Sequence, residues 1–219
     1  MEFSVEEALR YLGAGERADE TLCAQVAQEG VRLTGLIRPR YWYRIVTVTH
    51  EADGVFLPEA GLRLPGQTAK LMLEECGQVA LLACTLGAQC DSLLRTEQAR
   101  DMAKAVVLDA CASVWVEAGC DEAEREIAAR FPEKYLTDRF SPGYGDLPLE
   151  IQPELCRALD AQRRLGLCVT ESLLLTPAKS VTAIVGLADR PQKRRIRGCD
   201  YCAMHQTCSL RKRGNTCGL

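Results

Sequence analysis

The pattern that most constrains the fold is a helical repeat of apolar residues over residues 97–130. For much of this range the apolar side chains recur every three or four residues, so they share one face of a helix. That face comprises Ala105, Leu108, Ala112, Trp115, Val116 and Ile127. The acid-rich end at residues 121–126 is expected to face solvent. A helix this long predicts a large apolar surface elsewhere in the chain, against which it packs.

Strand-like patterns supply such a surface. Residues 41–49 are aromatic and β-branched, and a turn at residues 50–54 precedes Val55-Phe56-Leu57, which predicts a hairpin. Residues 79–86 form an apolar run bounded by glycines, and residues 180–187 alternate as a strand does. We expect these segments to form one antiparallel or mixed sheet.

Shorter helices complete the pattern. Ser4 and Glu7 form a capping box for a helix that ends near Gly13. Further helices are expected over residues 18–32, from Pro65-Gly66 to Glu75, and from Pro153 to Gly166. Helices and strands do not alternate as in a doubly wound sheet, and no G-x-G-x-x-G follows a strand, so the predicted fold class is α+β.

The last thirty residues differ in charge from the rest of the chain. Residues 190–219 hold eight basic residues and one acidic residue, a net charge of +7, which leaves −10 on residues 1–189 of a chain whose total is −3. We therefore expect two parts, residues 1–189 and a basic tail at residues 190–219. The acidic charge of the larger part would repel phosphate, so nucleic acid is not an expected partner.

The tail also carries four cysteines with the spacing of metal ligands. Cys199, Cys202, Cys208 and Cys217 lie within 19 residues, and the C-x2-C pair can grip one metal from a tight turn. Zinc and an iron–sulfur cluster both fit four thiolates. The C-x3-C-x2-C pattern of radical S-adenosylmethionine enzymes is absent. Basic residues around the cysteines either offset thiolate charge or dock an acidic electron donor.

The remaining eight cysteines read as small apolar residues in a reducing compartment. They lie inside apolar runs, where free cysteine behaves as a hydrophobe. They are Cys23, Cys76, Cys84, Cys90, Cys111, Cys120, Cys156 and Cys168. The first ten residues carry acid where a signal peptide carries base, and the uncharged stretch at residues 78–89 is too short to cross a bilayer. We expect a cytoplasmic protein that has no membrane partner.

The most informative segment is the loop Arg139-Phe140-Ser141-Pro142-Gly143-Tyr144-Gly145-Asp146-Leu147-Pro148. Two glycines flanking a tyrosine let the backbone approach a ligand, and the prolines stiffen both ends. Arg139 offers a planar fork for a carboxylate. Taken alone, the same residues also suit a tight structural turn with a surface arginine.

Together with a second segment, this loop resembles the activation (reactivation) domain of cobalamin-dependent methionine synthase. That family has an R-x-x-x-G-Y loop followed by a helix, an L-T-E-S element and a P-x-x-S-V strand. The matching residues are Arg139, Gly143 and Tyr144; Val169-Thr170-Glu171-Ser172; and Pro177 with Ser180-Val181. The resemblance covers residues 130–188 and is looser in the N-terminal half.

The resemblance implies a domain that binds S-adenosylmethionine and presents its methyl group to inactive cobalamin, while a flavodoxin or ferredoxin-like donor supplies an electron. The implied ligand residues are Arg139 for the carboxylate, Ser141 and Gly143 in the loop, and Tyr144 over the sulfonium. Asp146 or Glu171 would hold the amino group.

Departures from the family limit the role of the chain. It has no D-x-H-x-x-G sequence of the kind that ligates cobalamin, and no room for homocysteine or folate modules. We therefore expect an accessory protein that meets the cobalamin of a methionine synthase or related corrinoid methyltransferase on a partner chain, as a component of that activity and not a complete enzyme. The alternative is a non-enzymatic interaction module whose tail holds structural zinc. An iron–sulfur cluster is favoured over zinc because the implied task includes delivery of an electron.

Overall fold

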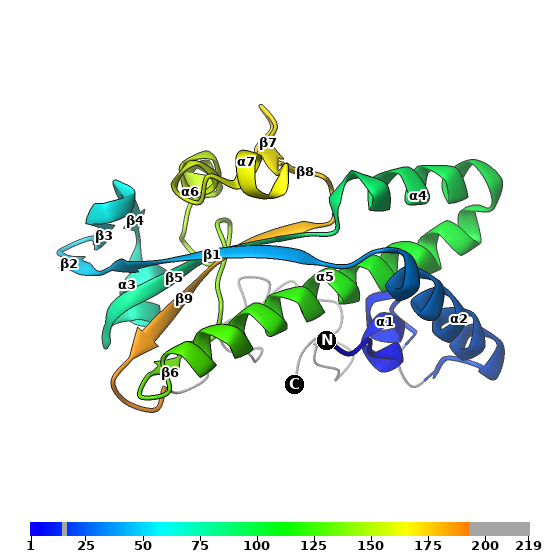
Figure 1. Ribbon diagram of the computed structural model, residues 1–219, viewed down its shortest axis with the longest axis horizontal. Coiled ribbons are helices and arrows are strands. Elements are labelled where there is room, and N and C mark those ends of the chain that lie inside the picture. Colours follow the sequence, from blue (N-terminus) through cyan, green and yellow to red (C-terminus); the bar gives the residue numbers. More distant parts are fainter. Residues whose placement is uncertain (15–16, 193–219) are drawn as a thin grey trace. The chain divides into compact units, whose positions relative to one another are not determined.

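The computed structural model describes residues 1–14 and 17–192 (Figure 1). Its α-helices are α1 (Val5–Tyr11), α2 (Glu20–Leu36), α3 (Gln67–Leu73), α4 (Gly87–Arg100), α5 (Met102–Arg130), α6 (Gln152–Ala158) and α7 (Ala161–Leu165). Its strands are β1 (Arg40–Thr47), β2 (Thr49–Glu51), β3 (Gly54–Leu57), β4 (Leu62–Pro65), β5 (Cys76–Thr85), β6 (Tyr135–Leu136), β7 (Cys168–Val169), β8 (Leu175–Thr176) and β9 (Ser180–Ala188). Short 3-10 turns, η2 (Pro58–Ala60) and η3 (Leu149–Ile151), precede β4 and α6.

In the described part of the chain the strands form three sheets. The largest has four strands in the order β1-β5-β9-β6, and β6 pairs antiparallel with β9. The second is the antiparallel meander β2-β3-β4, in which Val55 pairs with His50 on one side and Leu64 on the other. The third is the β7-β8 hairpin. The α+β class is confirmed.

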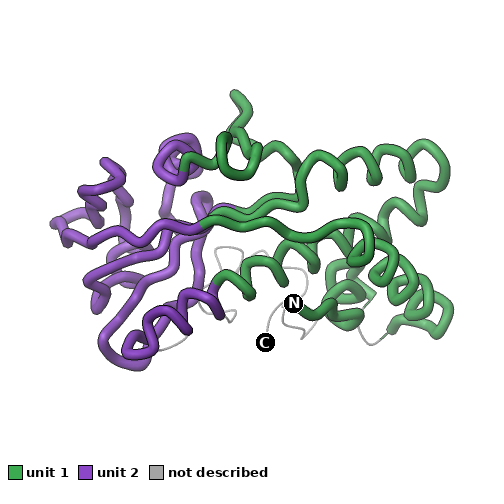
Figure 2. The backbone as a smooth tube through the Cα atoms, viewed as in Figure 1, with its two compact units in different colours: residues 1–42, 83–123, 160–181 green, residues 43–82, 124–159, 182–219 purple. Residues whose placement is uncertain are grey.

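The chain divides into two compact units, coloured separately in Figure 2. The first comprises Met1–Trp42, Ala83–Ala123 and Asp160–Val181. The second comprises Tyr43–Leu82, Glu124–Leu159 and the segment that begins at Thr182. The loop at residues 139–148 lies wholly within the second unit.

Helix α5 is held in the first unit by close contacts of two residues. The Trp115 indole N–H donates to the Ile37 carbonyl at 2.7 Å, which satisfies a buried polar group. At Gly119, a Cβ atom would lie 2.5 Å from Pro39 Cβ and 2.7 Å from Cys84 Sγ. The absence of a side chain there allows the segment before β1 to pack directly on the helix.

A buried ion-pair cluster joins three helices of the same unit. Arg32 of α2 contacts Glu29 Oε2 at 3.0 Å and Glu97 Oε1 of α4 at 2.8 Å, and Lys104 of α5 contacts Glu29 Oε1 at 3.1 Å. Both glutamates are buried. The Arg32 hydrogen bond holds the pKa of Glu97 below its ordinary value. The pairing with Arg32 thus favours the ionised form of the buried Glu97 carboxylate.

The core of the second unit lies between the sheet and the last turns of α5. Ala80 of β5, Ile127 of α5, and Val185 and Leu187 of β9 are fully buried together. Half-buried residues pack around them, namely Tyr43, Ile45, Phe131 and Leu136. Strand β9 is therefore anchored in this core, and residues 137–140 lie alongside it.

Most predicted elements are observed, with three corrections. Residues 97–130 are not one helix, because Asp101 has an extended backbone (φ −152°, ψ 101°) and its carboxylate accepts the Lys104 N–H at 3.1 Å, so α4 ends and α5 begins there. The expected hairpin pairs only residues 49–51 with residues 54–56 and lies in a second sheet. The helix expected from Pro153 to Gly166 is interrupted at Asp160, whose φ is +52°.

The predicted packing role of the eight cysteines outside the tail is largely confirmed. All eight are free thiols; Cys23 and Cys168 are half-buried and the others are buried. None of the helices in the described ranges is both long and apolar enough to cross a membrane.

Candidate functional site

The loop begins where the chain leaves the edge of the main sheet. Thr137 exchanges hydrogen bonds with Gly186 of β9: its N–H donates to the Gly186 carbonyl at 3.0 Å, and its hydroxyl accepts the Gly186 N–H at 2.8 Å. Phe140 exchanges two more with Ile184, at 3.1 and 2.8 Å, and its ring is buried. The backbone before and after Arg139 is therefore held against β9 by hydrogen bonds.

Residues 141–147 fold back in a tight turn. The Tyr144 N–H donates to the Ser141 carbonyl at 3.0 Å, the Gly143 N–H to the Leu147 carbonyl at 2.9 Å, and the Leu147 N–H to the Tyr144 carbonyl at 3.0 Å. Gly143 and Gly145 have φ values of +87° and +60°, in the region that favours glycine. Leu147 is buried and anchors the end of the turn. The turn thus holds Tyr144 between two glycines whose backbone has a positive φ.

The two glycines differ in the space around them. A Cβ atom at Gly143 would meet only Leu149 Cδ1, at an ordinary 3.5 Å, and Gly143 is exposed. A Cβ atom at Gly145 would lie 2.2 Å from the Thr68 hydroxyl oxygen. Both glycines are exposed, but the space on the Cβ side is open at Gly143, whereas at Gly145 it is filled by Thr68 of α3.

Arg139 is paired with an acidic residue of α5. Its Nη1 atom lies 2.5 Å from Glu124 Oε1, and the two side chains are 21% and 24% exposed. A guanidinium carries its five N–H donors in a planar fork, so this contact fixes the orientation of that plane. Glu124 thus orients the Arg139 guanidinium.

The Asp146 carboxylate is hydrogen-bonded to the start of α3. Its carboxylate accepts the Gln67 N–H at 2.6 Å and the Thr68 N–H at 2.8 Å. The side-chain hydrogen bond of Thr68, followed by these two N–H bonds, holds the pKa of Asp146 below its ordinary value, because each favours the ionised carboxylate.

The predicted ligand residues fall in both units. Arg139, Ser141, Gly143, Tyr144 and Asp146 are brought together by the turn, with Ser141 and Tyr144 half-buried. Glu171 belongs to the first unit, where it is exposed in the β7-β8 connection next to Thr170 and Ser172, whose hydroxyl oxygens lie 2.9 Å apart.

Sequence reasoning missed two residues of this site. Glu124 belongs to the acid-rich end of α5 that was expected to face solvent; that expectation is wrong for Glu124, which is half-buried against Arg139. Thr68 carries no motif of its own. A partial signal was Gly66, the N-cap of α3, which has no side chain with which to cap the helix.

The predicted metal ligands, Cys199, Cys202, Cys208 and Cys217, lie outside the described residues. Within residues 1–14 and 17–192, no group of three or more His, Cys, Asp or Glu side chains could hold a metal ion.

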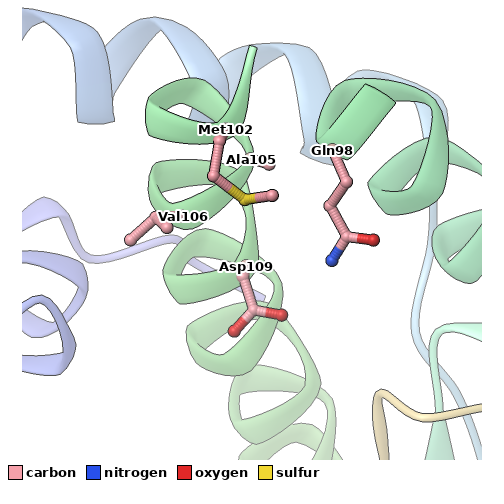
Figure 3. Close-up of a pocket in the computed structure, with 5 residues that line it drawn as sticks. All are labelled: Gln98, Met102, Ala105, Val106 and Asp109. Carbon is pink, nitrogen blue, oxygen red and sulfur yellow. The ribbon is translucent and has the colours of Figure 1, made fainter. Parts of the chain in front are cut away.

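A pocket in the first unit is lined by Gln98, Met102, Ala105, Val106 and Asp109 (Figure 3). Met102, Val106 and Asp109 follow one another along α5, and Gln98 comes from α4. Its lining contains a carboxylate and no cation, so it does not suit the carboxylate of an amino acid-like ligand.

Comparison with known proteins supports the fold and leaves the family open. No family model matches the sequence, and no curated protein matches it significantly. Among solved structures, the chain is similar to one described as the crystal structure of the MetH reactivation domain bound to AdoHcy. The TM-score is 0.62 with 14% sequence identity, and the match covers 99% of this chain and 86% of that chain. The fold of this chain is therefore that of the reactivation domain.

Proposed function

We propose that the chain binds S-adenosylmethionine at the loop of residues 139–146 and serves as a methyl-donor module for a corrinoid methyltransferase. The observation that carries the proposal is the likeness of fold over 99% of this chain to a reactivation domain solved with AdoHcy. The arginine–glycine–tyrosine loop adds support, because it is rigid, open at Gly143 and built from side chains that suit a sulfonium amino acid.

Each residue of the loop has a distinct task in this proposal. The Arg139 guanidinium binds the ligand carboxylate through charge-assisted hydrogen bonds. The Tyr144 ring covers the sulfonium, which an aromatic face attracts as it does other cations. Ser141 and the backbone at Gly143 line the ligand.

The proposed chemistry asks little of these side chains beyond binding and orientation. Bound S-adenosylmethionine supplies an electrophilic methyl group, and the acceptor is the cobalamin of a partner chain, either a methionine synthase or another corrinoid protein. No residue of the loop has to act as a general acid or base. The chain's contribution is to hold the sulfonium in one orientation where the partner can reach it.

The cysteine tail is proposed to hold one metal centre. Four thiolates suit an iron–sulfur cluster or zinc, and a cluster would pass an electron from a flavodoxin or ferredoxin-like donor to the partner's cobalt. Iron and sulfide assays on anaerobically purified protein, with electron paramagnetic resonance after dithionite reduction, test this part. Stoichiometric zinc without iron would contradict the cluster.

The experiment that tests the proposed function is methyl transfer in a reconstituted mixture. The pure chain is incubated with a candidate cob(II)alamin protein, a reductant and methyl-labelled S-adenosylmethionine. We expect label in the cobalamin fraction only when the chain is present, and less label with the Arg139→Ala variant. Binding of the labelled compound without transfer to any corrinoid partner would contradict the methyl-donor role.

A further inference from the structure

Two segments that are distant in the sequence are joined by reciprocal hydrogen bonds beside the loop. The Asp146 carboxylate accepts from the Gln67 and Thr68 N–H groups, and the Asp146 N–H in turn donates to the Thr68 hydroxyl at 3.2 Å. Asp146 lies 79 residues after Gln67, and all three residues belong to the second unit. Each segment thus satisfies polar groups of the other.

The contact replaces a cap that α3 lacks. The first N–H groups of a helix have no acceptor within the helix, and a polar side chain at the N-cap normally supplies one. The N-cap of α3 is Gly66, which makes no side-chain hydrogen bond. Asp146 supplies the acceptor from the loop, and its negative charge is favourable at a helix N-terminus.

The backbone on both sides is shaped for this contact. At Gly66, where φ is +98°, a Cβ atom would lie 2.7 Å from the Asp146 carboxylate, and at Gly145 it would lie 2.2 Å from the Thr68 hydroxyl. A side chain at either position would therefore displace the Asp146 carboxylate or the Thr68 hydroxyl from this contact. We call Gly66, Thr68, Gly145 and Asp146 the latch.

The helix side of the latch is itself fixed. The Gly66 N–H donates to the Asp53 carbonyl at 3.0 Å, and Lys70 Nζ donates to the Ala52 carbonyl at 2.6 Å. The start of α3 is thereby tied to the β2-β3 turn. The loop has its other anchor at Phe140 on β9, so Tyr144 sits on a span of backbone that is held at both ends.

We propose that Asp146 and Thr68 are positioning residues for the S-adenosyl ligand, and that the latch holds the Gly143–Tyr144 turn in the form that binds. This inference rests on the proposed function, and it gives Asp146 a different task from holding the ligand's amino group. Both oxygens of its carboxylate already accept backbone N–H groups, so its charge is directed at α3. Without the latch the turn would have to be ordered by the ligand, which lowers affinity.

The test compares variants that differ by one hydroxyl. Thr68→Val removes the acceptor for the Asp146 N–H, and Thr68→Ser keeps it. The dissociation constant for AdoHcy is measured by calorimetry on the full chain. We expect Thr68→Val, which removes one hydrogen bond, to weaken binding about three- to tenfold. Asp146→Ala removes two hydrogen bonds and should weaken binding at least as much, while Thr68→Ser stays near wild type. The fold-change of the double variant Thr68→Val/Asp146→Ala should be smaller than the product of the two single fold-changes, because the two substitutions remove different hydrogen bonds of one latch.

A matched control separates positioning from general loss of stability. Thr47 and Glu59, in the same unit, form a similar clamp, with the Thr47 hydroxyl 2.8 Å from both carboxylate oxygens. Thr47→Val should lower the melting temperature without changing the dissociation constant. Hydrogen exchange without ligand gives a second readout: exchange in residues 140–148 and at the start of α3 should speed up in Asp146→Ala and Thr68→Val but stay unchanged in Thr47→Val.

The outcomes distinguish this inference from the proposed function. If wild type binds AdoHcy and both latch variants bind it with wild-type affinity, the positioning role is wrong. If wild type does not bind AdoHcy, the proposed function is wrong and the positioning role falls with it, while ligand-free exchange still shows whether the latch orders the turn. Unchanged exchange in Asp146→Ala would overturn the latch itself.

Discussion

Removal of the Arg139 side chain should weaken binding of the S-adenosyl ligand and leave the fold almost intact. The guanidinium would donate charge-assisted hydrogen bonds to the ligand carboxylate, and such bonds contribute about 1.5–3 kcal/mol. At 1.4 kcal/mol per factor of ten, Arg139→Ala should raise the dissociation constant by about 10- to 150-fold. Titration calorimetry with AdoHcy at constant salt measures this directly.

The same substitution also breaks the ion pair with Glu124, so that effect needs its own control. A partly exposed pair contributes up to about 1 kcal/mol to stability, which chemical denaturation would detect. Glu124→Gln removes the pair and keeps the guanidinium. If Arg139→Ala loses no more affinity than Glu124→Gln, or loses none, the assignment of Arg139 to the ligand carboxylate is wrong.

Three further predictions concern the scaffold. Gly35→Ala should stabilise the chain by about 0.5–1 kcal/mol, because the added methyl group at this position of α2 meets no other atom. Gly119→Ala should destabilise the chain by about 1–3 kcal/mol, because the added methyl group meets Pro39 and the Cys84 thiol. Thermal denaturation distinguishes the two outcomes. Burial raises the pKa of Cys90 to about 11, so about one thiol in a thousand is ionised at pH 8, and peptide-resolved alkylation should modify half-buried Cys23 long before Cys90. The folded-state pKa of Asp146 is depressed, so its stabilising effect is present above the unfolded value of about 3.9 and is lost as pH falls through the folded pKa. In Asp146→Asn the free energy of unfolding should therefore fall less steeply between neutral and acidic pH than in wild type. An equally steep fall in both proteins would contradict the assignment.

Elements whose signals are local could be predicted from the sequence. The Ser4 hydroxyl accepts the Glu7 N–H at 3.2 Å, as the capping pattern predicted, because both residues lie within one turn. The strand at residues 79–86 and the strand at residues 180–187 are observed as β5 and β9, since long apolar runs between turn residues leave few alternatives. The same locality explains the prediction of the arginine–glycine–tyrosine turn, which is one continuous stretch of chain.

The features that were missed depend on contacts between distant segments or on one backbone angle. Residues 97–104 contain no proline or glycine, so the sequence gave no sign that the helix ends and restarts at Asp101. The sequence around Glu124 does not distinguish it from the nearby acidic residues that face solvent. Arg139 reaches Glu124 only because residues 135–140 run along β9. Thr68 carries no motif in the sequence, and Asp146 was assigned to the amino group of the ligand and not to α3. Gly66 before α3 indicates that the helix needs a capping partner but does not show which residue supplies it.

The most direct test of the central claim is to map where the S-adenosyl ligand touches the chain. The full chain is irradiated with ultraviolet light in the presence of labelled S-adenosylmethionine and digested with trypsin, which releases the loop as the peptides 135–139 and 140–157. We expect the label to be concentrated in these two peptides, excess AdoHcy to abolish it, and the Arg139→Ala variant to lack it at the same ligand concentration. Label confined to other peptides, or label in the loop that AdoHcy does not displace, would contradict the claim that this turn is the binding site.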